Sequence, residues 1–407
     1  MPTPSLTVLL TGLIFAATQA LAGQPPAPTA TPPAPAAAPA AAPAAAPAAV
    51  VWTPQPLKLD PTVSAALAEL TGGVSRERLI ATITSLPHGR SAGPTAEHAA
   101  RLAATQDLLA KELKALGAEF TTTPVPLRRG WGAVRPPAKP AEAKPADGPP
   151  AAIPAETAAL HEWKNFIVDL PGEKLPREVL LISAHFDSVP DSPGADDDGT
   201  GVAAILEMVR LLKAARHERT IRLCLFNHEE NGLIGSTHYV RVWREHNKSL
   251  PEAEREKIVG MVSLEMIGYF SDKPNSQQNP FKGMPGVPDI SVGDFLAICG
   301  SSRHREFNRE LVVAMLTAEP ACKTVLIDFF PNEQMAFIPP DLLRSDHAPF
   351  LNSGIAAIML TDTSNFRNPN YHKPTDTIDT LDIVRFTAGV RAITGAAWLL
   401  ARPLVKP

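Results

Sequence analysis

The sequence has few cysteines and little excess charge of either sign. Three cysteines among 407 residues allow at most one internal disulfide, which excludes a small disulfide-rich scaffold. Cys224 lies in an apolar run where a buried thiol is expected, whereas Cys299 and Cys322 either pair or stay reduced. The formal net charge of -4 gives no reason to expect nucleic acid or an anionic membrane surface as a partner.

Long hydrophobic runs are also missing after residue 22, since none approaches the roughly 18 residues needed to cross a bilayer. The one long run, residues 5–22, ends in Ala-Leu-Ala, a pattern that favours cleavage by signal peptidase. Lys and Arg do not precede this run, so an uncleaved anchor stays open as an alternative. Residues 1–22 are therefore predicted to be a signal peptide, and the mature protein is predicted to be secreted or periplasmic and free of the membrane.

No internal repeat of 20 to 50 residues is visible, which argues against solenoid and propeller folds. Many of the 43 prolines fall in two blocks. Residues 23–56 form an uncharged Ala/Pro tract that cannot bury a core, so a disordered linker is predicted there. Residues 136–154 form the second block, predicted to be a surface insertion in a single domain over residues 57–407.

Short apolar runs alternate with helix-forming segments in this domain. Nearly continuous apolar character predicts strands that are buried on both faces. These strands are expected over residues 165–170, 179–184, 221–226, 258–264 and 355–360. Apolar residues at helical spacing predict helices over residues 95–116, 201–214 and 386–400. The order of elements predicts an α/β fold with three layers, α/β/α, around a mixed and mostly parallel sheet.

Acidic and histidine residues follow four of the predicted strands. In open α/β sheets, ligands bind beyond the carboxyl ends of the strands, so these residues are expected to meet at one edge. In chain order they are His185 and Asp187, Glu229 and Glu230, Glu265, and His372. The prediction of a common site therefore depends on position as well as on residue type.

The turn PGADDDGTG, residues 193–201, places three neighbouring acids between glycines. Adjacent carboxylates repel one another unless a cation lies among them, and carboxylate with imidazole suits zinc, with manganese or cobalt as substitutes. Asp187 is placed to orient the imidazole of His185. Glu229 and Glu230 point in different directions, so one can bind metal while the other exchanges a proton with a water molecule. Hydrolysis of a peptide or amide is the predicted reaction.

Six motifs with consistent order and spacing closely resemble a known family. They are AHFDS, PGADDDGTG, NHEENGLIGS, SLEMIGY, SDHAPF and NYHKPTDT. The resemblance, which runs from about Leu79 to Leu400, is to the secreted di-zinc aminopeptidases that include bacterial leucyl aminopeptidases and glutamate carboxypeptidase II. It implies two zinc ions per chain and a peptide substrate.

The same resemblance implies a role for each site residue. Asp197 is expected to bridge the two zinc ions, with a cis peptide bond to Asp198. Glu230 and His372 are expected to hold one ion, and His185 and Glu265 the other. Glu229 is expected to be the general base and Tyr371 the hydrogen-bond donor to the oxyanion. Supporting positions around the ligands are expected for Asp187, Asp198 and Asp376.

Glu265 departs from the family pattern, because many members have aspartate there. The longer side chain affects the subsite for the free amine of the substrate, so dipeptidase or carboxypeptidase action stays open. Two other functions also stay open, a single-zinc glutaminyl-cyclase-type enzyme and a non-catalytic binding domain. His228 is expected to be a supporting or packing residue. His347 is expected to support its loop, with direct metal binding as the alternative, and residues 271–343 are expected to form the substrate pocket. Ser345 lacks a GxSxG motif, which argues against a serine hydrolase.

Overall fold

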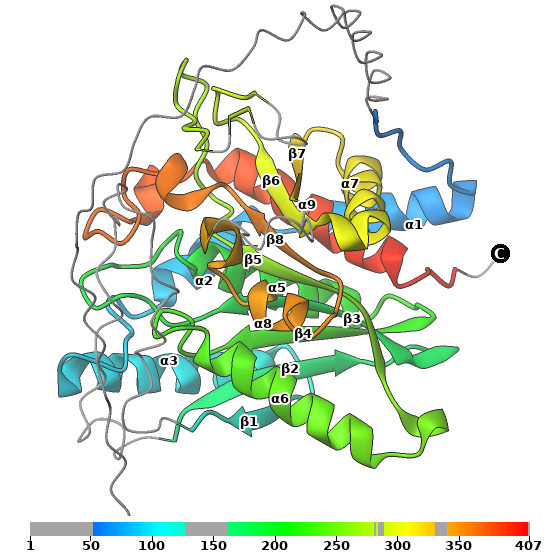
Figure 1. Ribbon diagram of the computed structural model, residues 1–407, viewed down its shortest axis with the longest axis horizontal. Helices are drawn as coiled ribbons and strands as arrows, with labels where there is room; N and C mark the ends of the chain where they lie inside the picture. Colours follow the sequence, from blue (N-terminus) through cyan, green and yellow to red (C-terminus); the bar gives the residue numbers. More distant parts are fainter. Residues whose placement is uncertain (1–51, 127–161, 281, 284–288, 330–339, 406–407) are drawn as a thin grey trace, which may run out of the picture. The chain divides into compact units, whose positions relative to one another are not determined.

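The computed structural model describes residues 52–126, 162–280, 282–283, 289–329 and 340–405 (Figure 1). The described residues from Thr53 onward cluster as one compact unit. The predicted signal peptide, nearly all of the predicted linker and the insertion at 136–154 lie outside the described residues. Those three predictions therefore stay predictions.

An eight-stranded sheet, counted over the described residues, is the centre of the fold. Its strands lie in the order β1-β2-β4-β3-β5-β8-β6-β7. Their bounds are β1 Thr121–Pro124, β2 Lys164–Leu170, β3 Leu175–His185, β4 Arg219–Phe226, β5 Lys257–Glu265, β6 Leu296–Ser301, β7 Thr324–Phe329 and β8 Ala357–Thr361. Strands β4, β3, β5 and β8 are parallel neighbours, whereas β2 and β6 flank them in antiparallel pairing. The mixed, mostly parallel sheet is confirmed.

The five predicted strands correspond to β2, β3, β4, β5 and β8, with bounds that differ by a few residues. The central strands are buried on both faces, as their continuous apolar runs indicate: Leu180, Leu181 and Ile182 of β3 are fully buried. Strands β1, β6 and β7 were not predicted. The first is a short polar edge strand, and the other two lie in the segment 271–343 that gave few signals.

Helices cover both faces of the sheet (Figure 1). The longer helices are α1 Pro61–Gly72, α2 Arg76–Ser85, α3 Ala96–Ala115, α5 Gly199–Leu212, α6 Ile234–Ser249, α7 Arg305–Ala318, α8 His347–Leu351 and α9 Ile383–Leu400. Helices α3, α5 and α9 confirm the three predicted ones. Thr95 caps α3 by accepting a hydrogen bond from the His98 main-chain N–H, and the leucines of one face are buried.

Helices α6 and α8 lie on one face, where Tyr239 and Phe350 pack against Leu181 and Phe226 of the sheet. Helices α5 and α9 lie on the other face. Among the described residues, α9 is the one helix long and apolar enough to cross a membrane, but 61% of it is buried inside the protein. Because it packs against α1, α5 and α7, it serves as an interior helix of the fold. The three-layer α/β/α arrangement is confirmed.

Candidate active site

The carboxyl ends of the central strands bring the predicted residues together. His185 is the last residue of β3 and Glu265 is the last residue of β5. Glu229 and Glu230 follow the end of β4. Parallel strands that end at one edge place these side chains within reach of each other, although they are far apart in the chain.

The acidic turn leads into the first turn of α5 and gives its three acids different roles. Asp198 caps the helix, since its carboxylate accepts hydrogen bonds from the N–H groups of Gly201, His185 and Met266 at 3.1 to 3.2 Å. A side chain at Gly201 would collide with that carboxylate, which explains the glycine. The peptide bond between Asp197 and Asp198 is cis, as expected. Asp198 therefore ties β3, β5 and α5 together.

Asp196 and Asp197 have different partners. The Asp196 carboxylate accepts hydrogen bonds from the Gly268 N–H at 2.9 Å and from the Asn368 amide at 2.7 Å. Only the middle acid of the triplet is therefore left to face the histidines, as the resemblance implied.

Two groups of potential ligands share Asp197. In the first, His185 Nε2 lies 3.2 Å from Asp197 Oδ1 and 3.6 Å from Glu265 Oε2. In the second, His372 Nε2 lies 3.2 Å from Asp197 Oδ2 and 3.1 Å from Glu230 Oε2. Each carboxylate oxygen of Asp197 thus faces one group, which is the arrangement that a bridging ligand requires.

The two groups fit zinc in both spacing and chemistry. Two ligand atoms about 2 Å from one tetrahedral zinc ion lie about 3.3 Å apart, close to the separations seen here. His185 Nε2, Asp197 Oδ1 and Glu265 Oε2 are buried and have no hydrogen-bond partner within the described part of the chain. Buried polar atoms without a hydrogen-bond partner are rare, and a bound cation would satisfy these three atoms. Burial acts to raise the pKa of Asp197, but the contacts with His185 and His372 hold it well below its usual range.

Asp187 and Asp376 hold the main chain around these groups. The Asp187 carboxylate accepts hydrogen bonds from the N–H groups of Glu229 and Glu230 at 3.1 and 3.2 Å. His185 Nδ1 lies 3.6 Å from this carboxylate and 3.2 Å from the Asp187 main-chain oxygen. The Asp376 carboxylate accepts from the N–H groups of Asp196 and Asp197 at 2.9 and 3.2 Å. Both acids therefore hold main-chain segments that carry members of the two ligand groups.

Arg90 also lies beneath the site, and the sequence reasoning missed it. It is fully buried and donates hydrogen bonds of 2.7 to 2.8 Å to the main-chain oxygens of Phe186, Pro193 and Gly194. Burial lowers the pKa of Arg90, while the charges of Asp197 and other nearby aspartates oppose that effect. Because arginine is seldom fully buried, its residue type predicted a surface position. The only sequence signal for burial was the small residues around it in HGRSAG.

Glu229 belongs to neither ligand group but is 9% exposed beside them. Burial, together with the carboxylates of Glu265 and Glu230, raises the pKa of Glu229 well above its usual value. A carboxylate with a raised pKa accepts and returns protons more readily near neutral pH. This environment suits a proton carrier next to a metal-bound centre.

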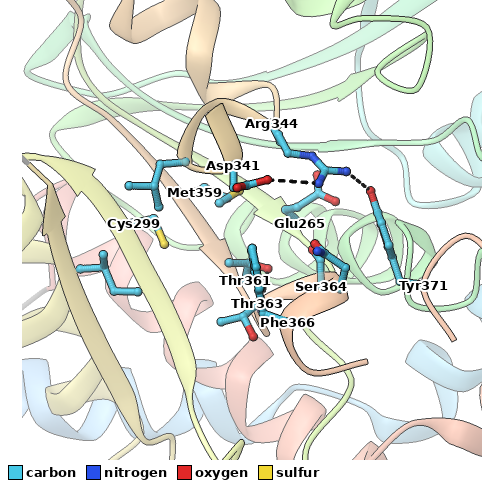
Figure 2. Close-up of a pocket in the computed structure, with 13 residues that line it drawn as sticks. Glu265, Cys299, Asp341, Arg344, Met359, Thr361, Thr363, Ser364, Phe366 and Tyr371 are labelled. Carbon is cyan, nitrogen blue, oxygen red and sulfur yellow. Dashed lines mark hydrogen bonds and ion pairs between the residues drawn. The ribbon is translucent and has the colours of Figure 1, made fainter. Parts of the chain in front are cut away.

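A pocket opens beside Glu265 (Figure 2). The segment 271–343 supplies part of its wall, as expected, and the rest comes from Glu265 at the end of β5, from Arg344 before α8, and from β8 and the loops that follow it. The described lining residues are Glu265, Cys299, Ile327, Asp341, Leu342, Arg344, Met359, Thr361, Thr363, Ser364, Asn365, Phe366 and Tyr371. Apolar side chains thus form much of the wall, and charged groups lie near Glu265.

Two further histidines and the cysteines take structural positions. His228 packs edge-on against Trp163 with ring centroids 5.2 Å apart. Buried His347 has its Nε2 2.9 Å from the Leu342 main-chain oxygen and belongs to neither ligand group. All three cysteines are buried and free, so the alternative in which Cys299 and Cys322 form a disulfide is not the one in this structure.

A doubly covered α/β sheet whose strand ends gather two histidine–carboxylate groups around one shared aspartate is the architecture of a metallohydrolase. The comparison with known families then gives a narrower class. The model of peptidase family M28 matches residues 165–393, more than half of the chain, so this protein belongs to that family of zinc exopeptidases.

Individual proteins are also similar to this chain in sequence. The chain is 32% identical over 230 residues to the uncharacterized protein YfbL of Escherichia coli, covering 54% of this chain and 66% of that protein. It is 28% identical over 239 residues to aminopeptidase YwaD of Bacillus subtilis, covering 56% of this chain and 43% of that protein. The matches therefore span less than two thirds of the length of these relatives.

Solved structures agree in fold. The LapA aminopeptidase of Legionella pneumophila matches with a TM-score of 0.56 at 19% identity, covering 87% of this chain and 79% of LapA. An aminopeptidase from Aneurinibacillus sp. strain AM-1 matches with a TM-score of 0.55 at 18% identity, covering 84% of this chain and 98% of that protein. At this identity the likeness establishes the α/β fold alone.

Proposed function

We propose that the protein is an aminopeptidase that uses two zinc ions to remove N-terminal residues from peptides. The observation that carries this proposal is the pair of ligand groups joined by Asp197, with the unligated Glu229 beside them. His185, Asp197 and Glu265 would hold one ion. Asp197, Glu230 and His372 would hold the other. Family membership and the names of relatives such as YwaD support the same reaction class.

The reaction divides between the metal and the protein side chains. Zinc held by these residues would lower the pKa of a bound water molecule to about 7 and would polarise a carbonyl group. Glu229 takes the proton from the attacking water and later returns it to the departing amine. Tyr371 donates a hydrogen bond to the oxygen that becomes negative when the carbonyl carbon is attacked. Asp187 and Asp376 keep the main chain around the ligands in place.

The pocket beside Glu265 is proposed to receive the side chain of the residue that is removed. Cys299, Ile327 and Met359 give its wall an apolar character, which suits an uncharged side chain. Glu265 lines the same pocket, so its carboxylate is proposed to face the free amine of the substrate. This pairing favours peptides with an unblocked N-terminus.

Export of a single domain over residues 57–407 is proposed from the N-terminal sequence. A relative in Mycobacterium tuberculosis is named a probable lipoprotein aminopeptidase, which fits a family that works outside the cytoplasm. N-terminal sequencing of protein recovered from the periplasm and the culture medium tests this part. A mature chain that starts at residue 23 is expected, and an intact Met1 in the membrane fraction would contradict it.

Hydrolysis of an aminoacyl panel tests the function as a whole. Aminoacyl amides with free and with blocked amines, together with dipeptides, are assayed before chelation, after chelation and after zinc return. We expect cleavage of unblocked substrates that chelation abolishes and zinc restores. Turnover that chelation leaves intact would exclude the metal mechanism. Formation of pyroglutamate with one zinc per chain would establish the cyclase instead, and zinc-loaded protein that cleaves nothing would favour a binding domain.

A further inference from the structure

Arg344 connects two sides of the substrate pocket through its guanidinium group (Figure 2). One nitrogen, Nη2, donates a hydrogen bond of 2.8 Å to the Tyr371 hydroxyl oxygen. The other, Nη1, lies 3.5 Å from Asp341 Oδ1. Arg344 precedes α8, whereas Tyr371 directly precedes His372 in a loop far along the chain. The contact therefore joins segments that only the fold brings together.

The direction of this hydrogen bond follows from chemistry. A guanidinium group has five donors and no acceptor, so the Tyr371 oxygen must be the acceptor. The contact with Arg344 therefore does not consume the phenolic proton. A hydroxyl that accepts a bond from a cation is also a stronger donor, because the first bond polarises the second.

The ring of Tyr371 is held as well as its hydroxyl. It stacks on the imidazole of His372 with ring centroids 3.8 Å apart and an interplanar angle of 23°. Stacking alone leaves the ring free to slide in its plane, whereas the hydrogen bond from Arg344 fixes the far end. Together the two contacts define where the hydroxyl lies relative to the ligand groups.

We propose that Arg344 is a positioning residue, which holds the Tyr371 hydroxyl so that its proton faces the oxyanion formed on the substrate carbonyl. Asp341 in turn restrains the guanidinium. This inference rests on the proposed function, in which Tyr371 is the donor to that oxyanion. It assigns to Arg344 an effect on the transition state and little effect on substrate binding.

Direct recognition of a substrate carboxylate is the competing role for Arg344. Two carboxylates, Asp341 and Glu265, line the same pocket and disfavour a third negative charge there. Arg344 is also only 33% exposed and already engaged by Tyr371 and Asp341. These contacts favour positioning over anion binding.

Kinetics of the zinc-loaded enzyme with uncharged aminoacyl anilides separate the two roles. Removing one oxyanion donor costs about 10²- to 10³-fold in kcat, so Tyr371→Phe sets the scale. We expect Arg344→Leu to lower kcat about 10- to 100-fold and to change KM less than about twofold. Arg344→Lys should recover part of the loss. The double variant should be no slower than Tyr371→Phe, because both changes remove the same interaction.

A binding measurement accompanies the kinetics. Calorimetry should show weaker binding of a tetrahedral phosphinic dipeptide to Arg344→Leu, by about the same factor as the loss in kcat, with binding of the product amino acid unchanged. Arg385→Leu is the matched control, since its side chain is 35% exposed and pairs with Asp272 on the surface. That control should leave both measurements as in the wild type.

Three outcomes would overturn the positioning role while leaving the proposed function intact. These are losses that multiply in the double variant, a change in KM without a change in kcat, and selective loss of substrates with an acidic residue. Each requires a wild-type enzyme that cleaves the uncharged substrate. A zinc-loaded wild type that cleaves no substrate refutes the proposed function itself.

Discussion

Replacing Arg90 with methionine removes a buried cation from beneath the site. The guanidinium donates to three main-chain oxygens, which belong to Phe186, Pro193 and Gly194. The side chain is fully buried, so water cannot replace these bonds without opening the structure. Breaking a buried charged arrangement by removing one partner costs about 3 to 5 kcal/mol, and we expect a loss of that size in the free energy of unfolding.

The loss should depend on metal. Asp197 and other aspartates near Arg90 are stabilised by its charge, and zinc bound at the ligand groups supplies positive charge to the same region. Urea unfolding measures this dependence when the variant and the wild type are each compared in the metal-free form and in the zinc-loaded form. The destabilisation should be larger in the metal-free pair. The free energy of unfolding of Arg90→Lys should lie between those of the wild type and Arg90→Met, because one ammonium group keeps the charge but cannot reach three oxygens.

An exposed arginine provides the control. Arg241, whose side chain is 53% exposed, forms an ion pair with Glu245 one helical turn away. Arg241→Met should change the free energy of unfolding by less than about 1 kcal/mol. If metal-free Arg90→Met stays within that same limit of the wild type, the buried hydrogen bonds of Arg90 do not stabilise the loop.

Three further predictions concern single side chains. Glu229→Gln keeps the size of the side chain but not the proton acceptor, so kcat should fall about 10²- to 10⁴-fold. Mass spectrometry should find the same zinc content as in the wild type, and loss of zinc would contradict a purely acid–base role. Asp376→Asn turns an amide toward two N–H groups of the acidic turn, and zinc affinity, measured by competition with a chelator, should fall about 10- to 100-fold. Burial lowers the pKa of His347 to about 4 from an ordinary 6.5, so the unfolded chain binds a proton at a higher pH than the folded protein does. The free energy of unfolding should therefore fall as the pH drops from 6.5 toward 4, by up to about 1.4 kcal/mol per pH unit. His347→Gln should flatten that part of the urea-unfolding profile, and an unchanged slope would count against it.

Strands in the middle of the sheet were predictable because burial on both faces requires a nearly continuous apolar sequence. β3, β4 and β5 are covered on both faces, so their sequences are nearly continuous in apolar residues. β1 is a four-residue edge strand of Thr and Pro, and β6 includes small residues such as Ala297 and Gly300. β1 has no apolar run, so only its pairing with β2 identifies it as a strand. β6 does carry a short apolar run, residues 295–299, which was not recognised as a strand.

The same distinction separates the site residues that were predicted from those that were missed. His185 and Glu265 end buried strands, so the sheet itself fixes their main chain. Arg90 and Arg344 lie outside the strands, in segments held near the site by tertiary packing and hydrogen bonds. No spacing in the sequence relates either arginine to the strand ends. Their positions follow only once the loops are placed.

Glu265 has the longer of the two acidic side chains, and its place in the sheet limits how that length is accommodated. Its main chain is held in register with Thr361 of the neighbouring strand β8. The extra methylene therefore cannot be offset by a shift of the strand and must be taken up by the side chain. One carboxylate oxygen still lies 3.6 Å from His185 Nε2, and the residue also lines the substrate pocket. The longer acid thus stays grouped with His185 and Asp197 while bringing negative charge to the wall where we propose that a substrate amine lies.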